Sequence, residues 1–118
     1  MKFFILLSLF VIFCNAAPAW AGNWTKADTG REIAFEALNG LDWAQTHWAI
    51  KHNFTECDPL IGCNASAGKI NTMMLSAAII HPLISYLLPP KYRVVFQWTS
   101  IAVKIGTISW NFSMGTQF

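Results

Sequence analysis

Nineteen consecutive residues without a formal charge, Ile70 to Leu88 (INTMMLSAAIIHPLISYLL), decide the fold of this chain when His81 is taken as neutral. A helix of about 20 mostly apolar residues is long enough to cross the hydrocarbon core of a bilayer. The stretch therefore predicts a membrane-spanning helix. Pro82 lies inside it and should kink it, because proline removes a backbone hydrogen bond. Pro89-Pro90 should end it.

A second apolar stretch follows the short basic turn Lys91-Tyr92-Arg93 and runs from Val94 to Met114. It is also long enough to span a bilayer, although Lys104 lies in its middle. The two stretches together predict a transmembrane hairpin of helices over about 70–88 and 94–114. Short loops that carry Lys and Arg tend to stay in the cytoplasm, so we expect the basic turn to face inward.

The composition agrees with a lipid environment. The chain has 118 residues, of which 54% are hydrophobic and only 12% are charged, whereas a typical soluble domain has about 25% charged residues. The net charge is +2 and the eight basic residues are scattered, which argues against nucleic-acid binding. We expect a small all-α membrane protein, with the lipid bilayer as its first partner.

The first 21 residues have the three parts of a secretory signal peptide. Met1-Lys2 is a basic start, Phe3 to Phe13 is an apolar run, and Ala19 and Ala21 occupy the small positions of a cleavage site. Cleavage would leave 22–118 as a single helical membrane domain. An uncleaved membrane anchor is the alternative. The expected location is the bacterial inner membrane, reached by the secretory pathway.

The stretch 32–50 has the pattern of an amphipathic helix, after a polar, loop-like segment over 22–31. One side of the helical wheel holds the apolar residues Ile33, Ala34, Ala37, Leu38, Leu41, Ala44 and Trp48. The other side holds Glu32, Glu36, Asn39, Thr46 and His47. Acidic residues near a helix centre would each cost about 2–3 kcal/mol in a membrane, which favours a helix lying outside the bilayer.

Three polar residues favour the opposite conclusion. Asp42, His81 and Lys104 each lie near the middle of their own predicted helix. A facing Asp42 carboxylate would offset much of the cost of burying Lys104. The sequence therefore leaves open whether the chain has two spans or three.

Cys57 and Cys63 lie six residues apart in the predicted loop 51–69. With two spans they would be exported to an oxidising compartment and could form a local disulfide. With three spans they would face the cytosol, and two incidental thiols are the alternative. The chain has no paired spacing of cysteines and histidines that would complete a metal site.

The sequence contains no catalytic or cofactor-binding motif, so we expect neither enzymatic activity nor a cofactor. The candidate site is instead a polar cluster on the predicted helices: Asp42, Gln45, Thr46, His81 and Lys104. It is interpreted first as a hydrogen-bonding patch that holds a small bundle together. An ion or proton conduit through Asp42, His81 and Lys104 is the alternative.

The C-terminal stretch allows a further alternative. Ile108 to Met114 alternates apolar and polar residues, and the chain ends in Phe118. Both features are typical of small outer-membrane proteins made of strands. About 97 mature residues are few for such a barrel, and 70–88 does not alternate at all.

The stretch from about 38 to 98 resembles a group of small membrane proteins of bacteria and their phages. The resemblance rests on Asp42-Trp-Ala-Gln45-Thr46, on the loop residues Glu56, Asp58, Pro59 and Gly62, and on Ser85-Tyr86, Leu88-Pro89, Tyr92-Arg93 and Gln97. Asp58 departs from the Asn typical of that loop, and the two cysteines are not part of the pattern. The resemblance implies helical hydrophobic segments, the first one included, and no established activity.

The expected function is non-enzymatic. We expect a small integral protein of the cell envelope that acts by contact with another membrane protein or by self-association. A phage-encoded protein that modifies the host envelope would fit this class, by analogy alone.

Overall fold

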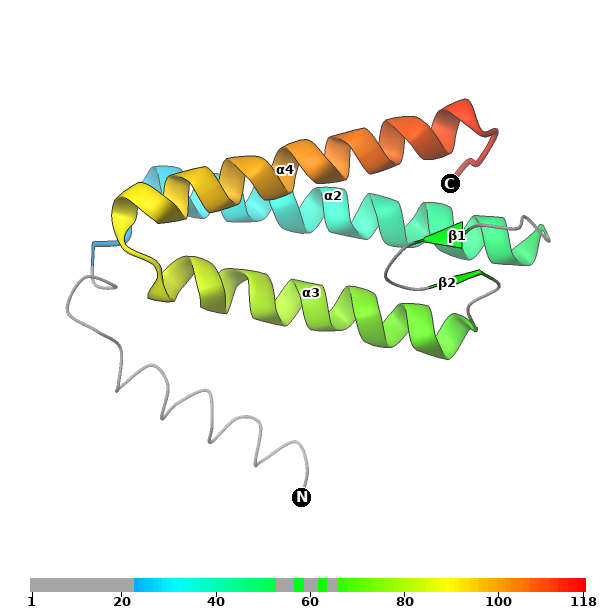
Figure 1. The fold of residues 1–118 in the computed structure, drawn as a ribbon, viewed down its shortest axis with the longest axis horizontal. Helices are drawn as coiled ribbons and strands as arrows, with labels where there is room; N and C mark the ends of the chain where they lie inside the picture. The colour runs from blue at the N-terminus through cyan, green and yellow to red at the C-terminus, as the bar shows by residue number, and fades with distance from the viewer. Residues whose placement is uncertain (1–22, 53–56, 59–61, 64–65) are drawn as a thin grey trace, which may run out of the picture.

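The computed structural model describes residues 23–52, 57–58, 62–63 and 66–118 and is all-helical apart from one very short hairpin. In chain order the elements are α2 (Lys26–Lys51), β1 (Cys57–Asp58), β2 (Gly62–Cys63), α3 (Ala67–Leu87) and α4 (Pro90–Ser113), shown in Figure 1. The predicted signal peptide, 1–21, and the motif residues Glu56 and Pro59 lie outside the described residues.

Helix α2 begins six residues before the predicted start at Glu32, so the prediction of a loop over 22–31 is wrong from Lys26 onward. The reason is a capping box at its first turn. The Asp28 amide donates to Thr25 Oγ1 at 3.1 Å, and the Thr25 amide donates to Asp28 Oδ2 at 2.8 Å. These two bonds satisfy backbone donors that have no partner at a helix start.

Helix α3 agrees closely with the predicted 70–88 stretch and starts three residues earlier. The Ser66 hydroxyl caps it by accepting from the Lys69 amide at 3.2 Å. The helix continues through Pro82 to Leu87. It then ends at the Leu88-Pro89 step, where the residue before a proline is biased toward extended backbone.

Helix α4 starts at Pro90, whose fixed backbone angle suits the first position of a helix. It ends in a Schellman motif at Gly115, which has a positive φ of 93°. The Gly115 amide donates to the Phe112 carbonyl at 3.0 Å, and the Thr116 amide donates to the Asn111 carbonyl at 3.1 Å. Residues 108–113 are therefore the last turns of the helix predicted over about 94–114, and the alternative that their alternation forms a strand is wrong.

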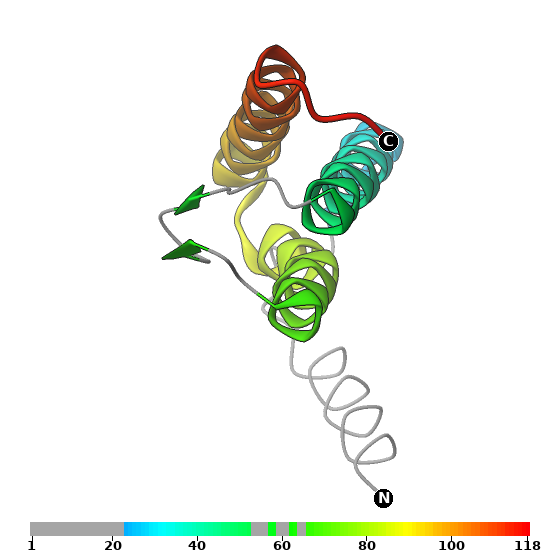
Figure 2. The ribbon, with the colours of Figure 1, turned by 90° about the vertical axis from the view of Figure 1, so that its right-hand side faces the viewer.

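The three helices run side by side, with α3 antiparallel to α2 and α4 (Figure 1). Figure 2 looks along the bundle and shows their ends as the corners of a triangle. Helix α2 contacts both other helices more extensively than these contact each other. Strands β1 and β2 pair antiparallel with Cys57 opposite Cys63 and Asp58 opposite Gly62. The cysteine side chains lie outside the described part of the chain, so the disulfide stays a prediction.

The interior of this bundle is polar. Among the described residues, twelve polar or charged residues are buried and only six apolar ones. The apolar six are Phe35, Ala49, Ile70, Met74, Ile101 and Ile108. In soluble proteins charged residues are rarely fully buried and large apolar residues form the core. This bundle has the reverse arrangement.

The outer surface is correspondingly apolar. Ile33 is 64% exposed, Val95 62% and Trp110 67%. The amphipathic pattern predicted for α2 is confirmed, and its orientation follows from the burial. The buried polar residues of α2, Glu32 and Asn39 among them, face the neighbouring helices, while Ile33, Ala37, Leu41 and Ala44 of the apolar stripe are exposed.

Candidate functional site

The polar interior begins with Arg93, which is fully buried in the first turn of α4. Its guanidinium donates to three backbone carbonyl oxygens at the end of α3, those of Ser85 at 2.7 Å, Tyr86 at 3.4 Å and Leu88 at 3.1 Å. It also donates to the Asn23 carbonyl at 3.0 Å and to Asp28 Oδ2 at 3.1 Å. A guanidinium has five N–H donors, and all five are used.

Asp28 links Arg93 to a second arginine. Arg31 forms an ion pair with Asp28 one turn along α2, and its Nε donates to Gln97 Oε1 at 2.7 Å. Burial of Asp28 acts to raise its pKa, but hydrogen bonds from Thr25 and from the two guanidinium groups outweigh this effect. The pKa of Asp28 therefore lies below its ordinary value, and the group is a carboxylate at neutral pH.

Glu32 is the next carboxyl group along α2 and lies among three side chains from the other helices. Gln97 Nε2 donates to Glu32 Oε1 at 3.0 Å, and the Ser85 hydroxyl donates to the same oxygen. His81 Nδ1 lies 2.8 Å from Glu32 Oε2. Ser85 and Gln97 are fully buried, so this cluster joins all three helices without contact with solvent.

The His81 ring is clamped between two aromatic side chains. Its centroid lies 3.6 Å from that of Phe35 on α2 and 4.6 Å from that of Phe96 on α4, with stacked geometry in both cases. Nδ1 faces Glu32, whereas Nε2 is buried and has no hydrogen-bond partner. A carboxylate partner favours the tautomer with the proton on Nδ1, which leaves Nε2 as the basic nitrogen.

An ion pair lies farther along the bundle, between Asp42 of α2 and Lys104 of α4. Lys104 Nζ is 2.6 Å from Asp42 Oδ2, and both side chains are largely buried. Met74 of α3 completes this level, with its Sδ 4.0 Å from Lys104 Nζ and its carbonyl accepting from Asn39 Nδ2 at 3.1 Å. The structure thus confirms that Asp42 faces Lys104.

Gln45 and Asn111 form the last polar contact of the interior. Asn111 Nδ2 donates to Gln45 Oε1 at 3.2 Å, and Gln45 Nε2 donates to the Ile108 carbonyl at 3.4 Å. The Thr46 hydroxyl donates to the Asp42 carbonyl of its own helix at 2.8 Å. Gln45 therefore bridges two helices, while Thr46 does not bridge them.

The five residues of the predicted cluster are thus only partly brought together. Asp42 and Lys104 pair, and Gln45 and Thr46 lie in the turns that follow Asp42. His81 pairs instead with Glu32. Glu32 precedes Asp42 by ten residues on α2, which is about 15 Å along the helix axis.

Sequence reasoning missed most of the interior. The interior residues that it did not assign to the site include Asp28, Arg31, Glu32, Asn39, Ser85, Arg93, Gln97 and Asn111. Arg93 was expected in an exposed basic turn and is instead completely buried. A signal was available, because the α2 residues Asp28, Glu32, Asn39 and Asp42 recur at helical spacing on one face.

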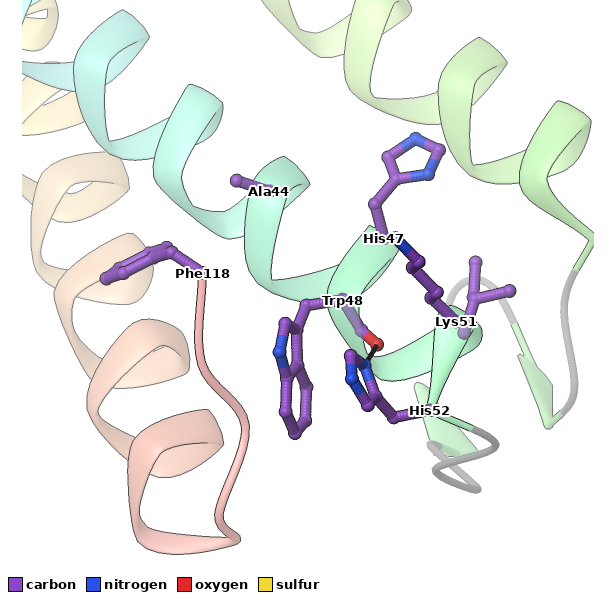
Figure 3. A pocket seen from close by; sticks show the side chains of 7 residues that line it. Ala44, His47, Trp48, Lys51, His52 and Phe118 are labelled. Atoms are coloured by element: carbon purple, nitrogen blue, oxygen red, sulfur yellow. Dashed lines mark hydrogen bonds between the residues drawn. The ribbon is translucent and has the colours of Figure 1, made fainter.

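An open groove of about 440 Å³ lies beside the C-terminal end of α2, and Figure 3 shows it from close by. His47 Nε2 is 2.6 Å from Asn71 Oδ1, and His52 Nδ1 is 2.8 Å from the Trp48 carbonyl oxygen. The Trp48 and His52 rings stack with centroids 4.1 Å apart, and Phe118 lies across the groove. Each histidine thus already has a protein partner at one ring nitrogen.

Comparisons with protein-family models, with curated proteins and with solved structures find no match to this chain. The resemblance to small membrane proteins of bacteria and phages therefore stays a prediction from short motifs. Six residues of those motifs, Asp42, Gln45, Thr46, Ser85, Arg93 and Gln97, are all buried in the polar interior.

Proposed function

We propose that the protein is an integral membrane protein of the cell envelope whose three helices all cross the bilayer. The observation that carries the proposal is the placement of charge. Among the charged residues of α2, α3 and α4, the exposed ones are four lysines, Lys26, Lys51, Lys69 and Lys91. The other charged residues of these three helices are buried or partly covered inside the bundle.

The four lysines lie at the two ends of the helices. Lys26 and Lys91 are near the starts of α2 and α4, and Lys51 and Lys69 are at the end of α2 and the start of α3. Lys26 and Lys51 are 25 residues apart in one helix, or about 38 Å by the helical rise. This separation exceeds the hydrocarbon core of a bilayer, about 30 Å. Asp28 and Arg93 then lie near the headgroups, outside the spanning segments.

Of the helices in the described part of the chain, α3 is the one that is long and apolar enough to qualify as a span by composition. Mean hydropathy gives every residue of α2 and α4 the same weight, including the polar residues that face the interior. It therefore does not describe the outer surface of these helices, which is the surface that lipid would contact. Between its terminal lysines, the fully exposed residues of α2 are uncharged: Ala27, Thr29, Gly30, Ile33, Ala37, Gly40, Leu41 and Ala44. Lipid would contact this surface, and the buried ion pairs would be shielded from it.

The proposed role of the protein is contact with another membrane protein, in an inner membrane reached by a cleaved signal peptide. The outer side of α4 supports such a contact. Ala102 and Gly106 are exposed one turn apart, and a Cβ added to Gly106 would meet no atom within 4 Å. Small residues at this spacing allow close approach of a second helix in lipid. A phage-encoded modifier of the host envelope remains within this proposal.

Photo-crosslinking in native membranes tests the proposed contact. A photoreactive residue at Gly106 is expected to give a discrete protein adduct, whereas the same residue at Ile33, on the outer side of α2, serves as the matched control. Lipid adducts alone from both positions would contradict a role based on protein contact.

Proton conduction is the second candidate function, and one observation favours it. The buried imidazole of His81 has one nitrogen, Nε2, without a hydrogen-bond partner, and its other nitrogen faces the Glu32 carboxyl group. Vesicle flux measurements test this function directly with Asp42→Asn and Lys104→Met. Flux in the wild type that is lost in both variants, with assembly unchanged, would support it. Absence of flux in the wild type would remove it.

A further inference from the structure

The charges of the interior do not balance. Four carboxyl groups of α2 face the other helices: Asp28, Glu32, Glu36 and Asp42. Three permanently charged cations face them: Arg31, Arg93 and Lys104. One negative charge is left over. An ionised group without a counterion is costly in a medium of low dielectric constant, so such sites tend to bind a proton or another cation.

The unbalanced carboxyl group is Glu36. Asp28 is paired with two guanidinium groups, and Asp42 is paired with Lys104. Glu32 accepts from Ser85 and Gln97 and faces His81. Glu36 Oε1 is buried and has no hydrogen-bond partner.

Two further buried atoms of the polar interior also have no hydrogen-bond partner, His81 Nε2 and Asn39 Oδ1. Both side chains are more than nine-tenths buried, with exposed fractions of 6% for His81 and 2% for Asn39. On α2, Glu36 follows the His81 partner Glu32 by one turn and precedes Asn39 by less than one turn. Glu36 also lies within electrostatic range of His81 and Lys104. Along α2, Glu36 and Asn39 thus lie between Glu32, which pairs with His81, and Asp42, which pairs with Lys104.

We propose that Glu36 and His81 form an internal site that binds one proton, with Asn39 Oδ1 available to hold an associated water. A carboxylate oxygen and a deprotonated imidazole nitrogen are both acceptors, so neither can bond the other until a proton is added. The proton comes from water. On Glu36 Oε1 it gives a neutral carboxyl group, and on His81 Nε2 it gives an imidazolium. Either position brings the interior to zero net charge.

The surroundings agree with a proton as the ligand. The charged groups that act on the pair are Glu32 from α2 and Lys104 from α4, while His81 is the one titratable residue of α3 that is buried in the described interior. The described residues contain no group of three or more His, Cys, Asp or Glu side chains that could hold a metal ion. The site rests on the proposed membrane insertion, because Glu36 is partly exposed and lipid must cover its exposed part.

Spectroscopy on the reconstituted full chain tests the site. Histidine ¹⁵N resonances report the charge of His81, with His81→Gln used to assign its signal, and infrared absorption reports protonated carboxyl groups in the same sample. At neutral pH the wild type is expected to show either an imidazolium at His81 or a protonated carboxyl band. Glu36→Gln should abolish the carboxyl band or weaken proton binding at His81 at least tenfold, about one pH unit. Glu36→Asp, which keeps the charge, should retain the wild-type signal.

A wild type with neutral His81 and no protonated carboxyl group would overturn the site, and this measurement needs no variant. A signal that is unchanged in Glu36→Gln would overturn it as well. Insertion is checked separately on the same vesicles by the sidedness of Lys26 and Lys51. Failure of insertion contradicts the proposed function, whereas failure of the proton signal in an inserted protein contradicts only this site.

Discussion

Arg93 holds three segments of the chain together, because its five N–H groups reach the start of α2, the end of α3 and the residues before α2. The carbonyl groups at the end of a helix have no partner within that helix, and Arg93 supplies partners for those of α3. Its positive charge is at the same time neutralised by Asp28. One buried side chain thus serves both as a helix cap and as a counterion.

We expect Arg93→Ala to lower the free energy of unfolding by about 3–5 kcal/mol, because it leaves the Asp28 carboxylate buried with fewer partners. Lys91→Ala is the matched control. Lys91 is exposed two residues earlier in the same turn, and its loss should change stability by less than about 0.5 kcal/mol. Unfolding in detergent micelles by titration with SDS measures both. Equal stabilities of the two variants would rule out the structural role of Arg93.

Asp28 predicts how stability changes in acid. Its pKa is lower in the folded protein than the ordinary value of 3.8. A group of this kind stabilises the fold fully above its unfolded pKa, and the contribution is lost as the pH falls through the folded pKa. The free energy of unfolding should therefore decrease as the pH drops below about 4. Asp28→Asn should be less stable at neutral pH and lose less stability in acid, as measured by unfolding at each pH. An identical acid profile in the variant would contradict this role.

At the scale of the helices, the pair Asp42–Lys104 fixes how α2 and α4 meet in the middle of the bundle. Removing one partner leaves a buried charge without its counterion, so Asp42→Asn and Lys104→Met should each cost about 3–5 kcal/mol. The double variant should cost less than the sum of the two single variants, because no charge remains. A double-mutant cycle by the same SDS titration should give a coupling energy of about 0.5–3 kcal/mol. Additive single effects would contradict the pair.

The two apolar helices could be predicted from the sequence to within a few residues, because long charge-free stretches and the prolines between them are local signals. The start of α2 could not. Its first turns contain Lys26, Asp28 and Arg31, which have the composition of a loop when solvent is assumed to surround them. A helical wheel separates the polar from the apolar face but does not say which face is buried.

A contact of the candidate site was predictable where both residues lie near the middle of their own helices, as with Asp42 and Lys104. It was not predictable where the pairing depends on the tertiary offset between helices. His81 meets Glu32, and Arg93 meets Asp28, because α3 and α4 are joined by a tight turn that brings the end of α3 and the start of α4 beside the start of α2. Residue spacing within one helix does not contain that information.

At the scale of the whole molecule, the arrangement of polar and apolar residues is the basis of the proposal that all three helices cross the membrane. With α2 in the membrane, the polar interior is complete and each carboxyl group except Glu36 has a partner. Arg93 no longer supports the expectation that the turn 91–93 faces the cytoplasm, because its charge is buried and paired with Asp28. The exposed lysines are then two at each end of the bundle, Lys26 and Lys91 against Lys51 and Lys69. Three spans place Cys57 and Cys63 on the side opposite to the start of α2.

Cysteine accessibility in sealed vesicles measures this arrangement most directly. Single cysteines replace Lys26, Lys51, Lys69 and Lys91 in turn, in a chain with Cys57→Ser and Cys63→Ser, and react with a membrane-impermeant thiol reagent before and after permeabilisation. We expect Lys26→Cys and Lys91→Cys to react from one side, and Lys51→Cys and Lys69→Cys to react from the other. Reaction of Lys26→Cys and Lys51→Cys from the same side would show that α2 does not cross the membrane and would contradict the three-span bundle.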